Sequence, residues 1–169
     1  DMNDVFNYPA IWRDGSSGGG GIYQVVEYNN SLYVSIVSGT YDTMNEKTRQ
    51  FRPFAVVRGD YDETKGTIDD ANAWTWTPII GDKENDNAKY TFGIDPERTS
   101  SGACTLQVYN DHLYIGEYND VNGGLRGILQ YKEFATLANN LTQSINLYRL
   151  DKDENVELVV GDPTEMFPE

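Results

Sequence analysis

The sequence has few of the residues that usually build metal sites or nucleophilic sites. Its 169 residues include one cysteine, Cys104, and one histidine, His112. A single cysteine excludes an internal disulfide, and its place in an apolar strand pattern predicts a buried, unreactive thiol. A single histidine gives little support to a histidine-rich metal site or a Ser-His-Asp triad. We therefore assign no catalytic residue, no metal ligand and no cofactor, and we do not favour an enzyme.

Positive charge and long apolar runs are also scarce. The chain carries 13 basic residues against 27 acidic ones, a formal charge of −14. Phosphate binding needs a basic patch, so a nucleic-acid partner is disfavoured. The acidic balance favours solubility in a secreted or cell-surface protein over an acidic site for a cation or a basic partner. No apolar run approaches the length of a membrane span. The residues after Asp1 lack a signal-peptide pattern, so a mature chain, a proteolytic fragment or an excised segment all fit.

What the sequence does contain is a repeat. The segment YNNSLYV at 28–34 returns as YNDHLYI at 109–115, 81 positions later. Gly81-Asp82, which closes an apolar run, returns as Gly161-Asp162, 80 positions later. A fixed period in two separate motifs indicates a repeated structural unit. Because such a unit cannot bury its own apolar faces, it is expected to stack on a neighbour.

Each unit is predicted to hold four short strands, at 22–28, 32–37, 54–59 and 74–80 and then at 103–109, 113–118, 146–150 and 156–160. Asn29-Asn30 and Asn110-Asp111 supply tight hairpin turns, since Asn and Asp tolerate positive φ. An insertion in the second unit is predicted to form a helix over 131–141, because its apolar residues recur with a helical period.

These elements predict an all-β, β-propeller-like fold of two four-stranded antiparallel blades, with a leading strand and one short helix. The divisions are a leading strand and Gly-rich loop at 1–21, the first repeat at 22–82, a connection at 83–102, the second repeat at 103–162 and a tail at 163–169.

Several strand motifs resemble those of bacterial extracellular β-propellers. The best matches are Leu113–Gly116, Leu147–Arg149 and Val159–Asp162, while Leu32–Val34 and Ile79–Asp82 match in part. Ile11–Gly15 resembles the third strand of a preceding blade. The resemblance covers most strands and few loops. It implies a propeller fold and a secreted or surface location, and says little about activity.

Two blades would leave two flat faces bare, whereas propellers have typically four to eight blades. Three arrangements remain open: a segment of a larger propeller, a ring closed with copies of the same chain, or the two halves of a β-sandwich. The expected partners are therefore the rest of the propeller, from missing blades, another chain or self-association, together with a glycan or protein ligand.

Two acidic segments resemble the start of a calcium loop, Asp151–Asn155 and Asp60–Gly66. Both lack the glycine required at the sixth position, where Val156 and Lys65 stand, and Asp162 replaces the glutamate at the twelfth position of the first segment. We predict that both segments are acidic turns without a metal ion.

Trp74 and Trp76 are two residues apart, so on a strand they point the same way. They would form a stacking platform for a sugar ring if exposed, or pack against a neighbouring blade if buried. Tyr41, Tyr61 and Tyr118 lie near loops and would contribute to the same kind of surface.

The strands repeat while the loops differ in length, and no spacing singles out a catalytic pair of carboxylates. We therefore predict a secreted or cell-surface module that binds a glycan or a protein. The alternatives are part of a carbohydrate-active enzyme with catalytic residues partly outside this chain, and a purely structural segment.

Overall fold

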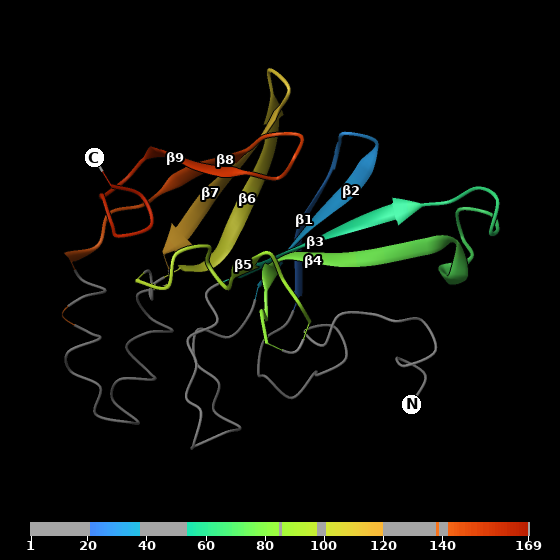
Figure 1. Ribbon diagram of the computed structural model, residues 1–169, viewed down its shortest axis with the longest axis horizontal. Helices are drawn as coiled ribbons and strands as arrows, with labels where there is room; N and C mark the ends of the chain where they lie inside the picture. The colour runs from blue at the N-terminus through green and yellow to red at the C-terminus, as the bar shows by residue number, and fades with distance from the viewer. Residues whose placement is uncertain are drawn as a thin grey trace.

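The computed structural model describes residues 21–37, 54–84, 86–97, 101–119, 138 and 142–168. This part of the chain forms two β-sheets (Figure 1). The first sheet contains β1 (Gly21–Tyr28), β2 (Ser31–Val37), β3 (Phe54–Tyr61), β4 (Trp74–Gly81) and β5 (Tyr90–Thr91), in that order, with a short 3-10 helix η2 (Ala71–Ala73) before β4. The second sheet contains β6 (Ser101–Tyr109), β7 (His112–Asn119), β8 (Leu147–Leu150) and β9 (Val156–Val160).

The prediction of a mostly β chain with antiparallel sheets is confirmed. The first sheet nevertheless holds a fifth strand, which the sequence analysis assigned to the connection at 83–102. This strand, β5, runs parallel to β4 and pairs Tyr90 with Ile80 and Thr91 with Gly81. A two-residue strand is too short to show an alternating pattern, so nothing in the sequence distinguished it from a loop.

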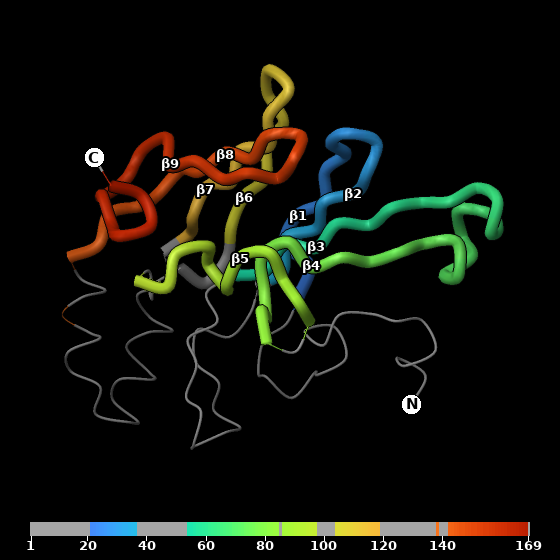
Figure 2. The backbone as a smooth tube through the Cα atoms, viewed as in Figure 1, coloured from blue at the N-terminus to red at the C-terminus, as the bar shows by residue number. Residues whose placement is uncertain are grey.

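The two sheets share their hairpin geometry. Asn29 and Asn30 have φ values of 50° and 61°, and Asn110 and Asp111 have 48° and 60°. Positive φ at both central residues is the signature of the turn that matches the twist of two-residue hairpins. Both hairpin turns point in the same direction (Figure 2).

The strand registers repeat as well. Tyr33 of β2 pairs with Arg58 of β3, and Tyr114 of β7 pairs with Arg149 of β8. The β3–β4 ladder has an irregularity just before the arginine, between residues 56 and 57, and the β8–β9 ladder has one between residues 147 and 148. In both repeats the arginine of the tyrosine–arginine pair thus comes directly after the irregularity, so the strands of the two sheets are equivalent in register.

The main core lies where the inner faces of the two sheets meet. Its buried members come from both sheets and, at Ile94, from the segment after β5: Tyr28, Tyr33, Phe54, Val56, Ile79, Ile80, Ile94, Cys104, Leu106, Leu113, Ile115, Tyr148 and Leu150. Strand β6 packs against β1, β2 and β3. The side-chain amide of Gln24 donates to the carbonyl of Leu106 at 2.7 Å and accepts from its N–H at 2.8 Å. Gln24 therefore satisfies backbone groups of β6, an edge strand of its sheet.

The outer face of the first sheet has a second, smaller core. Val34, Ile36, Ala55 and Val57 are buried there together with Phe92, and Trp76 packs against them. Apolar side chains that alternate along β2 and β3 are thus buried on both faces of the first sheet.

Several predicted features lie outside the described residues: the leading strand and most of the Gly-rich loop at 1–21, Tyr41, and the helix at 131–141 apart from Ala138. Within the described part, no helix has the length and apolar character needed to cross a membrane.

Candidate functional site

Three aromatic rings form a row on the β3–β4 hairpin, which projects away from the second sheet (Figure 1). The rings of Trp74 and Trp76 are nearly parallel, 15° apart, with centroids separated by 5.6 Å. Tyr61 continues the row, with its ring centroid 5.4 Å from that of Trp74. Tyr61 is exposed and both tryptophans are half-buried. We call these three residues the aromatic row.

The rings of the row are held in place by the residues around them. The indole N–H of Trp74 donates to the carbonyl of Ile68 at 2.8 Å, and the hydroxyl of Tyr61 donates to the carbonyl of Gly66 at 3.0 Å. Trp76 lies over Gly59, where a Cβ atom would come within 2.5 Å of the indole ring. The absence of a side chain at Gly59 therefore leaves room for the indole ring of Trp76.

The loop beside the row, between β3 and β4, is acidic and internally bonded. The hydroxyl and N–H of Thr64 bond the Asp62 carboxylate and lower its pKa, and the hydroxyl of Thr67 does the same for Asp69. Asp70 caps η2 by accepting from the N–H of Asn72. The carboxylates of Asp62 and Asp69 therefore stay ionised near neutral pH and lie in the loop next to the row as hydrogen-bond acceptors.

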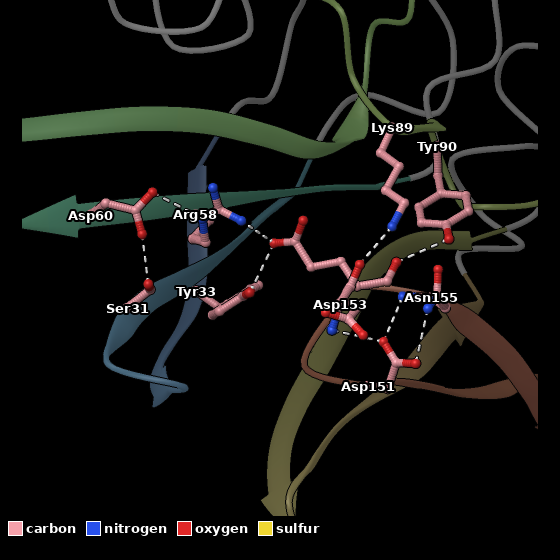
Figure 3. Close-up of polar contacts among 10 residues, drawn as sticks. Ser31, Tyr33, Arg58, Asp60, Lys89, Tyr90, Asp151, Asp153 and Asn155 are labelled. Atoms are coloured by element: carbon pink, nitrogen blue, oxygen red, sulfur yellow. Dashed lines mark hydrogen bonds and ion pairs between the residues drawn. The ribbon is translucent and has the colours of Figure 1, made fainter.

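A second polar cluster joins the two sheets and is drawn in Figure 3. One carboxylate oxygen of Glu154, in the β8–β9 turn, accepts from Arg58 Nη1 at 2.6 Å and from the Tyr33 hydroxyl at 2.9 Å. Arg58 Nε also donates to Asp60 at 2.9 Å, and Ser31 donates to the other oxygen of Asp60 at 2.6 Å. The cluster is a charge-assisted contact between the sheets.

The electrostatics of this cluster favour a structural role. Burial, and then the charge of Glu154, raise the pKa of Tyr33 far above its usual range. Burial disfavours the charged form of Arg58, but the carboxylates of Glu154 and Asp60 outweigh it and raise the pKa of Arg58. A tyrosine and an arginine that hold their protons this firmly cannot exchange them near neutral pH, so neither serves as an acid or base.

The β8–β9 turn presents Glu154 in a fixed geometry. Asp151 accepts from the N–H groups of Asp153 and Asn155, at 2.9 Å and 2.8 Å, and from the side-chain amide of Asn155 at 3.0 Å. The hydroxyl of Tyr90, in β5, donates to the Glu154 carbonyl at 2.9 Å, and Lys89, just before β5, donates to the Asp153 carbonyl at 2.8 Å (Figure 3). The missed strand β5 therefore positions the turn.

In each of the two calcium-like segments one carboxylate, that of Asp151 or Asp62, bonds groups of its own turn, while Glu154 and Asp60 bond residues outside it. The side chain and backbone of Asn155 lower the pKa of Asp151, whose two oxygens accept the hydrogen bonds of its own turn. Asp62 bonds Thr64 and forms an ion pair with Lys65. Among the described residues, no group of three or more histidine, cysteine or acidic side chains is arranged to hold a metal ion.

Cys104 is buried in the main core, and burial raises its pKa. The thiol is therefore neutral and shielded, as its apolar strand pattern predicted. Nearby, Glu117 accepts from the N–H of Asn146 at 3.0 Å, and Asn146 donates to the Tyr148 hydroxyl at 2.7 Å. This buried network fixes the start of β8.

The predicted aromatic residues are only partly brought together. Trp74, Trp76 and Tyr61 form one row, while Tyr118 is exposed on β7 of the other sheet. Sequence reasoning missed the cluster around Glu154. The available signal was the tyrosine–arginine pair, which recurs in both repeats. The chain matches no protein-family model, no curated protein and no solved structure.

Proposed function

We propose that the chain is a secreted or cell-surface module of a β-propeller-like repeat protein, and that it binds a neutral glycan on the aromatic row. The observation that carries this proposal is the row itself, in which three adjacent rings are partly accessible on a projecting hairpin. The propeller-like arrangement is supported by two antiparallel sheets of matching register that pack face to face.

A sugar suits this surface because its apolar ring face stacks on an aromatic ring while its hydroxyl groups bond polar neighbours. The hydrogen bonds of Tyr61 and Trp74 already orient two of the rings, so little side-chain freedom is lost on binding. Asp62 and Asp69 provide acceptors for hydroxyl groups beside the row.

Among the ligands that stack on aromatic rings, the negative charge of the chain disfavours those that are themselves negatively charged. Nucleobases stack equally well, but their phosphates would meet a chain with a formal charge of −14. The same repulsion disfavours glycans rich in uronic acids. A neutral glycan is the class that remains.

Affinity electrophoresis through gels that contain hydroxyethyl cellulose, laminarin or galactomannan tests this function. We expect at least one polysaccharide to retard the natural chain, and Trp74→Ala to weaken its binding on the order of tenfold through the lost stacking. Tyr118→Ala, which removes an exposed tyrosine from the other sheet, is the matched control and should migrate like the natural chain.

Two results would count against this function. Equal retardation of Trp74→Ala and the natural chain, or no retardation by any neutral polysaccharide, would remove the row as a glycan site. Release of reducing ends from a retarding polysaccharide would favour the carbohydrate-active enzyme over the binding module.

A further inference from the structure

The outer face of the second sheet reproduces the face that the first sheet buries. Tyr109 and Tyr114 lie 81 positions after Tyr28 and Tyr33, and their ring centroids are 6.3 Å apart, compared with 5.6 Å in the first pair. The two ring pairs are also tilted alike, by 57° and 59°. Yet Tyr28 is 4% exposed and Tyr109 is 70% exposed.

The apolar residues around these tyrosines show the same contrast. Ile80, opposite Val56 at the end of β4, is 0% exposed, whereas Val160, opposite Leu147 at the end of β9, is 60% exposed. Four positions before the arginine of each repeat, the first repeat has the fully buried Phe54 and the second has the exposed Ile145. The second sheet thus carries a copy of a buried face that nothing covers among the described residues.

The polar pair at the centre of this face is also a copy. In the first sheet, Tyr33 and Arg58 share a carboxylate supplied by the turn of the next sheet, that of Glu154. In the second sheet, Arg149 instead bonds Glu157 of the neighbouring strand at 2.6 Å. The side chains of Arg149 and Glu157 are both partly exposed, and hydrogen bonds with Glu157 and Tyr114 raise the pKa of Arg149.

We propose that the outer face of the second sheet docks a further antiparallel sheet of the same repeat. Its occupant would present an apolar inner face like that of β6–β9 and a β-turn carboxylate, in the place of Glu154, to Tyr114 and Arg149. The packing of the second sheet on the first is the template for this contact, since the rings, apolar residues and guanidinium recur in the same register. The inference rests on the repeat-protein part of the proposed function and is independent of glycan binding, since the aromatic row lies on the other sheet.

The experiment extends the full chain with a second copy of residues 83–168, in which the copied cysteine is replaced by serine. Tyr109→Cys in the original part reports on the outer face through its rate of reaction with a thiol reagent. We expect this thiol to react at least about tenfold more slowly in the extended chain than in the natural chain, because docking buries it. Arg149→Ala in the original part of the extended chain should restore much of the reactivity of the thiol at residue 109.

Ile68→Cys is the matched control, since Ile68 is an exposed residue of the β3–β4 loop on the first sheet. It should react equally fast in both chains. Equal reactivity of Tyr109→Cys in the two chains would overturn the proposal, whether the added repeat stays unfolded or folds elsewhere. Protection that instead rises with the concentration of the natural chain would assign this face to a second copy, and would also overturn it.

Discussion

The same tyrosine–arginine pair lies in two different environments in this molecule. In the first sheet, Tyr33 is buried and Arg58 bonds Glu154 across the boundary between the sheets. In the second sheet, Tyr114 is half-buried and Arg149 bonds a residue of its own sheet. The comparison shows that the repeated residues determine strand register, whereas the neighbouring sheet determines which side chains become core.

The contrast between buried and exposed copies is tested most strongly at residues 54 and 145. Phe54→Ala removes a fully buried ring from the main core and should lower the free energy of unfolding by about 4 kcal/mol. Ile145→Ala, at the equivalent exposed position, should change it by less than about 0.5 kcal/mol. Urea denaturation followed by circular dichroism measures both. Similar losses for the two variants would mean that the outer face is already covered.

A smaller difference in the free energy of unfolding is expected between equivalent positions in β1 and β6, the first strand of each sheet. Gln24→Ala removes the amide that satisfies both backbone groups of Leu106 and should cost about 2 kcal/mol in urea denaturation. Thr105, 81 positions after Gln24, is exposed, and Thr105→Ala should cost less than about 0.5 kcal/mol. A neutral Gln24→Ala would show that water replaces the amide and that the contact does not hold the sheets together.

A cysteine should affect the pH dependence of stability at the buried position 104 but not at position 23, the exposed position that lies 81 residues earlier. Burial raises the pKa of Cys104 in the folded chain, while the unfolded thiol ionises near its usual pKa of about 8.5. Above that pH the unfolded chain binds fewer protons, so this thiol lowers the free energy of unfolding by about 1.4 kcal/mol per pH unit.

The measurement is urea denaturation at several alkaline pH values, with Cys104→Ala as the reference that removes this slope. Adding Tyr23→Cys to that reference should not bring the slope back, because residue 23 is exposed when folded. A slope in Cys104→Ala equal to that of the natural chain would assign it to other groups.

Much of the fold follows from short motifs in the sequence. Asn29-Asn30 and Asn110-Asp111 predicted the two hairpins because positive φ is cheap for these residues. Short apolar segments separated by turn residues predicted the eight longer strands. Strand β5 escaped prediction because its pairing depends on where the chain returns after β4, which no local pattern encodes.

The candidate site was predictable only in part. The spacing of Trp74 and Trp76 placed their rings on one side of a strand, but Gly59, which makes room for Trp76, comes from the neighbouring strand. The contact of Arg58 with Glu154 joins residues 96 positions apart and depends on the packing of the two sheets. Contacts of this kind follow from tertiary structure, which sequence periodicity does not reveal.

The central claim is that Glu154 fastens the second sheet to the first, and a pair of double-mutant cycles tests it directly. The single and double alanine variants of Arg58 and Glu154, compared in urea denaturation, should give a coupling energy of about 2 kcal/mol because both groups are largely shielded from water. The same cycle on the more exposed pair Arg149 and Glu157 should give less than about 0.5 kcal/mol. A coupling energy for Arg58 and Glu154 no larger than that of the exposed pair would contradict the account.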